Sequence, residues 1–164
     1  MKPIIPFLSA FLLLAGGCKQ DSGRKNAAPA PQTAEEYTQV IIKEVQKVIL
    51  STDQQLREYE PRHLEMPAKE EGEPRTLRLW AEAGNPVKLT ATEPGGNGFI
   101  AFYFANGELF YAARPDAGFI FIGQELKYWL DEGWQPAQAP EEERREQERL
   151  LLKQARAYLT LFEE

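Results

Sequence analysis

Side chains that could do chemistry are few in this chain of 164 residues. The only histidine is His63, and Ser22 and Ser51 lie outside any G-x-S-x-G turn, so no nucleophile and base are paired as in a Ser-His-Asp triad. Metal-binding spacings such as H-E-x-x-H and C-x-x-C are absent as well. His63 lies in the Pro- and Glu-rich segment 59–74, which we interpret as a solvated loop. The sequence therefore predicts no catalytic residue, no cofactor and no metal site.

The clearest motif surrounds the single cysteine, Cys18. Lys2 precedes an apolar run, Ile4–Leu14, and the small residues 15–17 lead into the cysteine. A run of about 11 residues is too short to cross the roughly 30 Å hydrocarbon layer as a helix, but it has the length and flanks of a secretory signal. A single cysteine also excludes an intramolecular disulfide, so the fold must be held together by packing.

The tetrapeptide Ala15-Gly16-Gly17-Cys18 resembles the lipobox of bacterial lipoproteins, in which Leu-Ala-Gly or a similar tripeptide precedes an invariant cysteine. Leu14 stands one position further from the cysteine than that pattern has it. The resemblance implies that residues 1–17 are a signal peptide and that Cys18 becomes an acylated N-terminus, its palmitate-type chains anchoring the protein in a membrane. Lys19, in place of aspartate, implies the outer membrane where the cell envelope has two.

Composition and charge restrict the partners of the mature chain. Residues 18–33 are small, polar and Pro-containing, so we expect a flexible tether, and residues 34–164 are long enough for one domain. The net charge is −6, which argues against a nucleic-acid binder because such proteins neutralise phosphates with Lys and Arg. The expected partners are the membrane, through the lipid anchor, and an envelope protein.

Two amphipathic helices are expected, one at each end of the domain. Thr33 and Glu36 have the spacing of a capping box, and apolar residues recur every three or four positions behind them, which predicts a helix over 34–52. Pro140 and the glutamates after it favour a helix start, and the apolar stripe further on predicts a helix over 140–162. Residues 141–149 are charged on all sides, so we expect this first part to project into solvent.

Between the helices the apolar period changes to two, which predicts strands. Turn residues at 84–86, Asn106-Gly107 and Gly123-Gln124 separate pairs of strands, so we expect an antiparallel meander of about six strands over 75–130. The fold class is therefore α+β, with both helices packed on the sheet. The repeated hairpins resemble those of small uncharacterised bacterial proteins, which implies no activity.

The strands over 99–104 and 119–122 are apolar on both faces, so both faces must be covered. If both helices lay on one face, the other would be an exposed apolar patch of the kind that marks binding sites, whereas helices on opposite faces would make these strands a core. Trp80, Trp129 and Trp134 fall on or near the more polar outer strands, and we name them as the candidate binding surface.

The sequence thus indicates a lipid-anchored protein of the cell envelope that acts as a non-catalytic binding or interaction module through an aromatic-rich sheet. An alternative is a carboxylate-dependent hydrolase acting on envelope glycans or lipids. It would use Asp131 and Glu132, because a carboxyl group among aromatic neighbours such as Trp129 and Trp134 holds its proton more readily, as a general acid must.

Overall fold

The computed structural model describes residues 33–67, 74–92 and 98–163. Helix α1 (Ala34–Leu56) begins with the predicted capping box, in which Thr33 Oγ1 accepts from the Glu36 amide at 3.1 Å and the Thr33 amide donates to the Glu36 carboxylate at 3.2 Å. The helix continues past its predicted end at residue 52 as far as Leu56. Two features favour the extra turn: no glycine or proline occurs between Thr33 and Pro61, and Asp53 in this turn contacts the sheet.

Seven strands, all antiparallel to their neighbours, follow one another in both sequence and space across the described residues. They are β1 (Arg62–Met66), β2 (Arg75–Glu82), β3 (Asn85–Thr92), β4 (Phe99–Ala105), β5 (Glu108–Ala113), β6 (Ala117–Ile122) and β7 (Glu125–Asp131). The α+β class and the meander are confirmed. The six strands expected over 75–130 are present as β2–β7, but the sheet has seven strands, because the segment interpreted as a loop around His63 contains the additional edge strand β1.

Tight hairpin turns explain why strands that are consecutive in the sequence are also neighbours in the sheet. Asn106 and Gly107 both have positive φ, at 54° and 80°, and so do Gly123 and Gln124, at 59° and 66°. These values suit the tight two-residue turns that match the twist of a hairpin. The first turn differs from its prediction at 84–86, since Ala83-Gly84 forms it and β3 already begins at the following residue.

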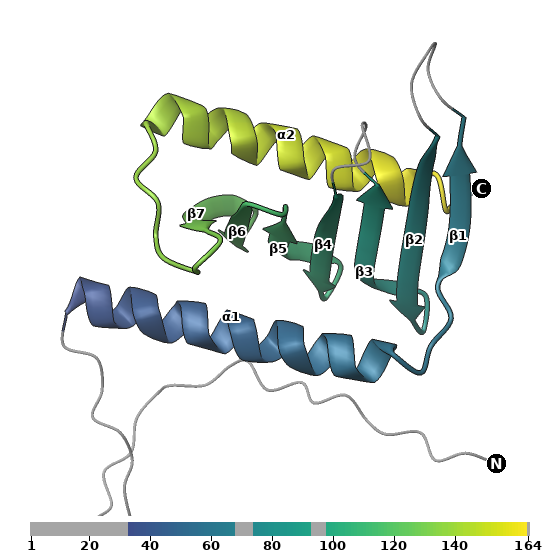
Figure 1. Cartoon of the computed structure of the whole chain (residues 1–164), viewed down its shortest axis with the longest axis horizontal. Coiled ribbons are helices and arrows are strands. Elements are labelled where there is room, and N and C mark those ends of the chain that lie inside the picture. Colours follow the sequence, from purple (N-terminus) through teal and green to yellow (C-terminus); the bar gives the residue numbers. More distant parts are fainter. Residues whose placement is uncertain (1–32, 68–73, 93–97, 164) are drawn as a thin grey trace, which may run out of the picture. The chain divides into compact units, whose positions relative to one another are not determined.

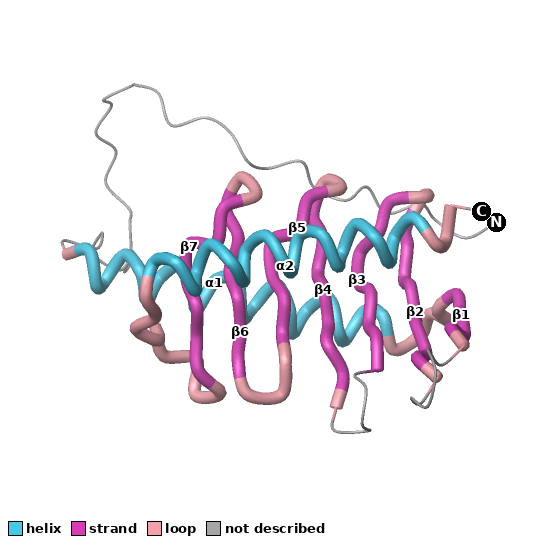
Figure 2. Tube along the Cα trace, turned by 90° about the horizontal axis from the view of Figure 1, so that it is seen from above, coloured by secondary structure: helices cyan, strands magenta, loops and turns pink. Residues whose placement is uncertain are grey.

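Helix α2 (Glu141–Thr160) is slightly shorter than the predicted 140–162, because Pro140 is its N-cap and Leu161 its C-cap. Its first turn carries three glutamates, which favour the positive end of the helix dipole. Both helices run across the strands, α2 on one face of the sheet and α1 on the other (Figures 1 and 2). All described elements belong to one structural unit.

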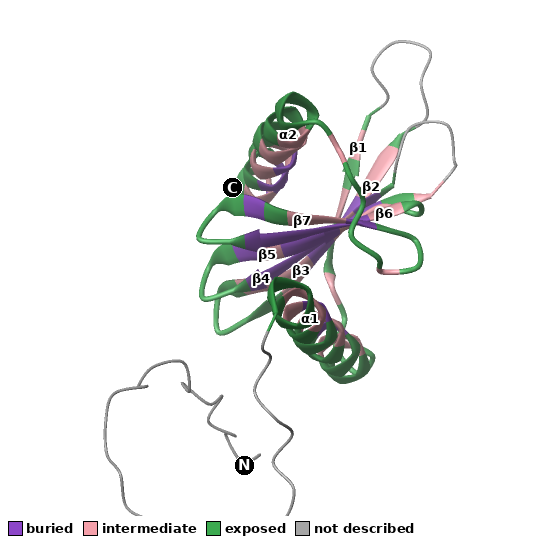
Figure 3. Ribbon diagram, turned by 90° about the vertical axis from the view of Figure 1, so that its left-hand side faces the viewer, coloured by how far each residue is buried: buried purple, intermediate pink, exposed green. Residues whose placement is uncertain are grey.

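The sheet separates two hydrophobic layers. On the α2 side Phe102 and Phe119 pack with residues of α2 such as Leu151, and on the α1 side Tyr103 and Ile120 pack in the layer that includes Ile42 and Ile49 of α1. Figure 3 shows the buried parts of the strands lying between the two helices. Strands β4 and β6 are therefore covered on both faces, and the aromatic stretch is a core rather than a bare apolar surface.

Candidate interaction surfaces

The three tryptophans do not form one surface. Trp129 lies on the α2 side, where its ring is tilted against Phe119 at a centroid distance of 5.2 Å. Trp134 lies on the α1 side and stacks on Tyr111 at 5.2 Å with an interplanar angle of 11°. Trp80 is on β2, far along the sheet from β7, and all three side chains are half-buried. The structure thus distributes the candidate binding residues over both faces and both halves of the sheet.

The titratable residues singled out in the sequence also lie apart. His63 is exposed on β1, whereas Asp131 and Glu132 are exposed at the end of β7, and β1 and β7 are the two opposite edges of the sheet. One oxygen of Asp131 accepts a hydrogen bond from the Gln135 amide at 2.9 Å. In the described part of the chain, no group of three or more His, Cys, Asp or Glu side chains is placed to hold a metal ion. Cys18 lies outside the described residues.

The polar cluster that sequence reasoning missed consists of Asp53, Lys88 and Tyr103. The carboxylate of Asp53, near the end of α1, accepts from the Lys88 ammonium at 2.7 Å and from the Tyr103 hydroxyl at 3.1 Å. The Lys88 Nζ also lies 4.9 Å from the centre of the Tyr103 ring and 5.7 Å from that of Trp80. The indole Nε1 of Trp80 donates to the Tyr59 carbonyl at 3.1 Å. These contacts attach the end of α1 to strands β2, β3 and β4.

Burial determines what this cluster can do chemically. Burial, followed by the negative charge of Asp53, raises the pKa of Tyr103 far above its usual value of 10, and burial raises the pKa of Tyr111 to about 12. Both phenols therefore stay protonated at neutral pH and are not nucleophiles, and the Tyr103 hydroxyl donates to Asp53. The cluster is an anchor between helix and sheet.

Replacing Asp53 by alanine is expected to lower the free energy of unfolding by about 1–3 kcal/mol, because the Tyr103 hydroxyl and the Lys88 ammonium lose their acceptor where water reaches them poorly. The Lys88 side chain is only 16% exposed. Urea unfolding followed by circular dichroism measures the loss.

Glu44→Ala is the matched control for Asp53→Ala, because it breaks an ion pair with Lys47 on the same helix in which both side chains are more than half exposed. That change should stay within about 0.5 kcal/mol. Equal effects of the two substitutions would show that the Asp53 cluster holds nothing in place.

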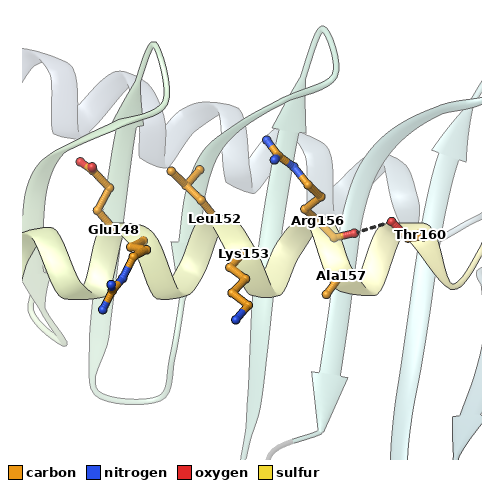
Figure 4. A pocket seen from close by; sticks show the side chains of 7 residues that line it. Glu148, Leu152, Lys153, Arg156, Ala157 and Thr160 are labelled. Carbon is orange, nitrogen blue, oxygen red and sulfur yellow. Dashed lines mark hydrogen bonds between the residues drawn. The ribbon is translucent and has the colours of Figure 1, made fainter.

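A cationic stripe runs along the outer face of α2. Arg149, Lys153 and Arg156 are exposed and, with Leu152 and Thr160 among others, line a shallow hollow formed by α2 side chains (Figure 4). Charged side chains are the usual occupants of the solvent side of a helix whose apolar side packs on a sheet, which is sufficient to explain the stripe. We therefore assign it no ligand.

The outer edge of β7 is closed by contacts from two segments. The Glu148 carboxylate accepts from the Leu126 amide at 2.7 Å, and one Arg144 nitrogen donates to the Leu126 and Lys127 carbonyls at 2.8 and 3.1 Å. Further along, residues 135–137 return beside the strand and pair with residues 129–131. The expectation that 141–149 projects into solvent is thus wrong for Arg144 and Glu148, which cap the strand edge.

The opposite edge, β1, has no such cover. Its backbone pairs with β2 in the register Arg62↔Leu79 to Met66↔Arg75. The Arg62 side chain donates to the Phe162 carbonyl at 2.8 Å, but among the described residues no hydrogen bond joins the β1 backbone to any element other than β2. Leu64 and Met66 are half-buried against the α2-side core, whereas His63 and Glu65 are exposed on the other side. An edge strand of this kind presents unpaired amides and carbonyls, which can pair with another strand.

Comparisons with known proteins identify no relative, since no family model, curated protein or solved structure matches this chain. Within the described residues, no helix is both long enough and apolar enough to span a membrane.

Proposed function

We propose that this chain is a lipid-anchored protein of the bacterial cell envelope, acylated at Cys18, and that its domain is a non-catalytic interaction module. The observation that supports an interaction role is the difference between the two edges of the sheet. Side chains and a returning segment close β7, whereas within residues 33–67, 74–92 and 98–163 only β2 pairs with β1. Exposed edges promote aggregation, and natural proteins usually protect them. β1 carries only the milder protections of an edge strand, namely its short length, flanking prolines and charged residues, so its backbone is suited to bind a partner by strand addition.

This proposal moves the binding surface from the aromatic faces of the sheet to its edge. The faces of β4 and β6 are occupied by the two helices, and Trp129 and Trp134 are in ring contact with core aromatics. Strand addition requires neither face. It uses the backbone of β1 for affinity and the side chains of its residues for selectivity.

Thiol labelling in the native envelope tests the edge assignment. Cys18 is the only cysteine, so acylation would leave an introduced cysteine as the only free thiol. In intact envelopes, His63→Cys on β1 is expected to react several-fold more slowly with a bulky maleimide than Arg149→Cys on the outer face of α2. Both native residues are exposed in the domain itself. Equal labelling of the two positions would refute an occupied β1 edge.

A further inference from the structure

We propose that the partner of β1 is a second copy of this chain, paired edge to edge and antiparallel about a two-fold axis through Leu64. This proposal depends on the proposed function, because it names the occupant of the same open edge. It is supported by the sequence of β1, by the prolines that flank the strand and by the closed edge at β7.

The five residues of β1 are complementary to themselves in this register. Leu64 lies opposite Leu64 of the other copy, each His63 opposite a Glu65, and each Arg62 opposite a Met66. Residues directly opposite in an antiparallel pair point to the same face, so the leucines meet on the α2 side and the His–Glu pairs on the other. Opposite charges facing each other across strands are favourable, and like charges are not.

The neighbouring strand strengthens the charge match. Arg78 of β2 is the register partner of His63, and it is exposed. Glu65 of the second copy would therefore lie opposite His63, which can donate a hydrogen bond. One strand further it would approach Arg78, which carries a permanent positive charge.

Other symmetric registers fit less well. A two-fold axis perpendicular to the sheet leaves each side chain on the same face in both copies. Residues directly opposite each other must share a face, so the axis has to pass through a residue of β1, and the nearest alternatives to Leu64 are Glu65 and His63. Centring on Glu65 would oppose two glutamates, and centring on His63 would place Glu65 outside the pair, opposite Pro61. Pro61 and Pro67 flank the strand and cannot donate a backbone hydrogen bond, which limits the pairing to β1 itself.

The closed edge at β7 determines what the pairing can build. Once two β1 strands have paired, each end of the joined sheet is a β7 whose edge is already capped by Arg144, Glu148 and residues 135–137. The assembly thus stops at two copies and does not continue as a fibre. A contact of five residue pairs is below the usual size of a stable interface, so we expect weak dimers in dilute solution. Anchoring at a membrane surface would raise the effective concentration of the chains.

Mixed cysteine crosslinking tests the partner and the register together. Full-length acylated chains carrying His63→Cys and chains carrying Glu65→Cys, distinguished by size tags, are reconstituted into phospholipid vesicles and oxidised. The mixture is expected to give at least about tenfold more disulfide-linked dimer than either variant alone. Only the mixed pair lies directly opposite, whereas identical positions lie diagonally, about 7–8 Å apart and beyond disulfide reach. Both native side chains are exposed, so folding should not suffer.

A competition control tests the charge match. Excess wild-type chain should reduce the crosslinked heterodimer about fivefold, whereas excess Glu65→Lys chain should leave it nearly unchanged, since the introduced lysine would oppose His63 and approach Arg78. Equal yields from mixed and single variants, or equal competition by both chains, would overturn the dimer. If crosslinking fails while His63→Cys stays protected in the native envelope, the open edge binds a different partner, and the proposed function stands without the dimer. If the protection is absent as well, both proposals are wrong.

Discussion

Replacing Phe102 by alanine is expected to lower the free energy of unfolding by about 3–5 kcal/mol. Phe102 is fully buried on β4, the central strand of the sheet, and its ring lies edge-on to Tyr158 of α2 at a centroid distance of 6.3 Å. Truncation removes this contact and leaves a cavity between the strand and the helix. Domains of this size are stabilised by about 5–15 kcal/mol in total, so the loss should be evident in urea unfolding followed by circular dichroism.

Phe99→Ala provides the control within the same strand. Phe99 is the same residue type on β4, but its side chain is 55% exposed, so its removal should cost less than about 1 kcal/mol. The difference between the two variants measures how far burial, rather than the loss of an aromatic ring from the strand, determines stability. Similar losses from both would mean that β4 does not sit between its two layers as described.

The alternation along β4 could be predicted, but the helix that covers each face could not. Side chains alternate along a strand, so the sequence correctly predicts that Phe102 and Tyr103 lie on opposite faces of the sheet. The apolar stripes of α1 and α2 show that each helix has a buried side, but not which face of the sheet it meets. That choice depends on how the loops at 57–61 and 132–140 lead the chain around the sheet, and neither segment has a pattern that specifies direction.

The hairpins show where local rules suffice and where they fail. Asn106-Gly107 forms its predicted turn because both residue types tolerate positive φ. Ala83 was not predicted as a turn residue because an alanine at a φ of 49° is uncommon, so the predicted turn began at Gly84. Strand β1 was missed for a different reason: the prolines nearby suggested a loop, although they lie outside residues 62–66 and Leu64 and Met66 already alternate with polar neighbours.

The features on which the interaction proposal depends were the hardest to predict. Arg144 and Glu148 read as solvated charges because their helix is polar on all sides there, and their role appears only when α2 crosses the edge of β7. Asp53 and Lys88 are likewise distant in sequence and meet only because the end of α1 lies over β3. Contacts between separate elements leave no periodic signal, so the sequence could not locate these contacts.

Replacing Cys18 by alanine is expected to abolish labelling by radioactive palmitate and to leave the chain at its unprocessed length, with residues 1–17 still attached. The thiol of Cys18 is the only one available for the first acyl chain, and the signal residues before it are expected to be removed only after that chain is attached. Two or more acyl chains hold a protein stably at a bilayer, and the variant lacks the residue that would carry them, so the loss of label should be nearly complete. Labelling, gel electrophoresis and fractionation of cells expressing the full chain provide the measurement.

Lys19→Asp is the matched control, because it alters the residue beside the cysteine and leaves the acceptor thiol in place. It should keep both the palmitate label and the membrane fraction, and in a host with two membranes it should shift the protein towards the inner one. If Cys18→Ala still carried the palmitate label and reached the processed length, Cys18 would not be the acylated residue and the lipid anchor would be assigned wrongly.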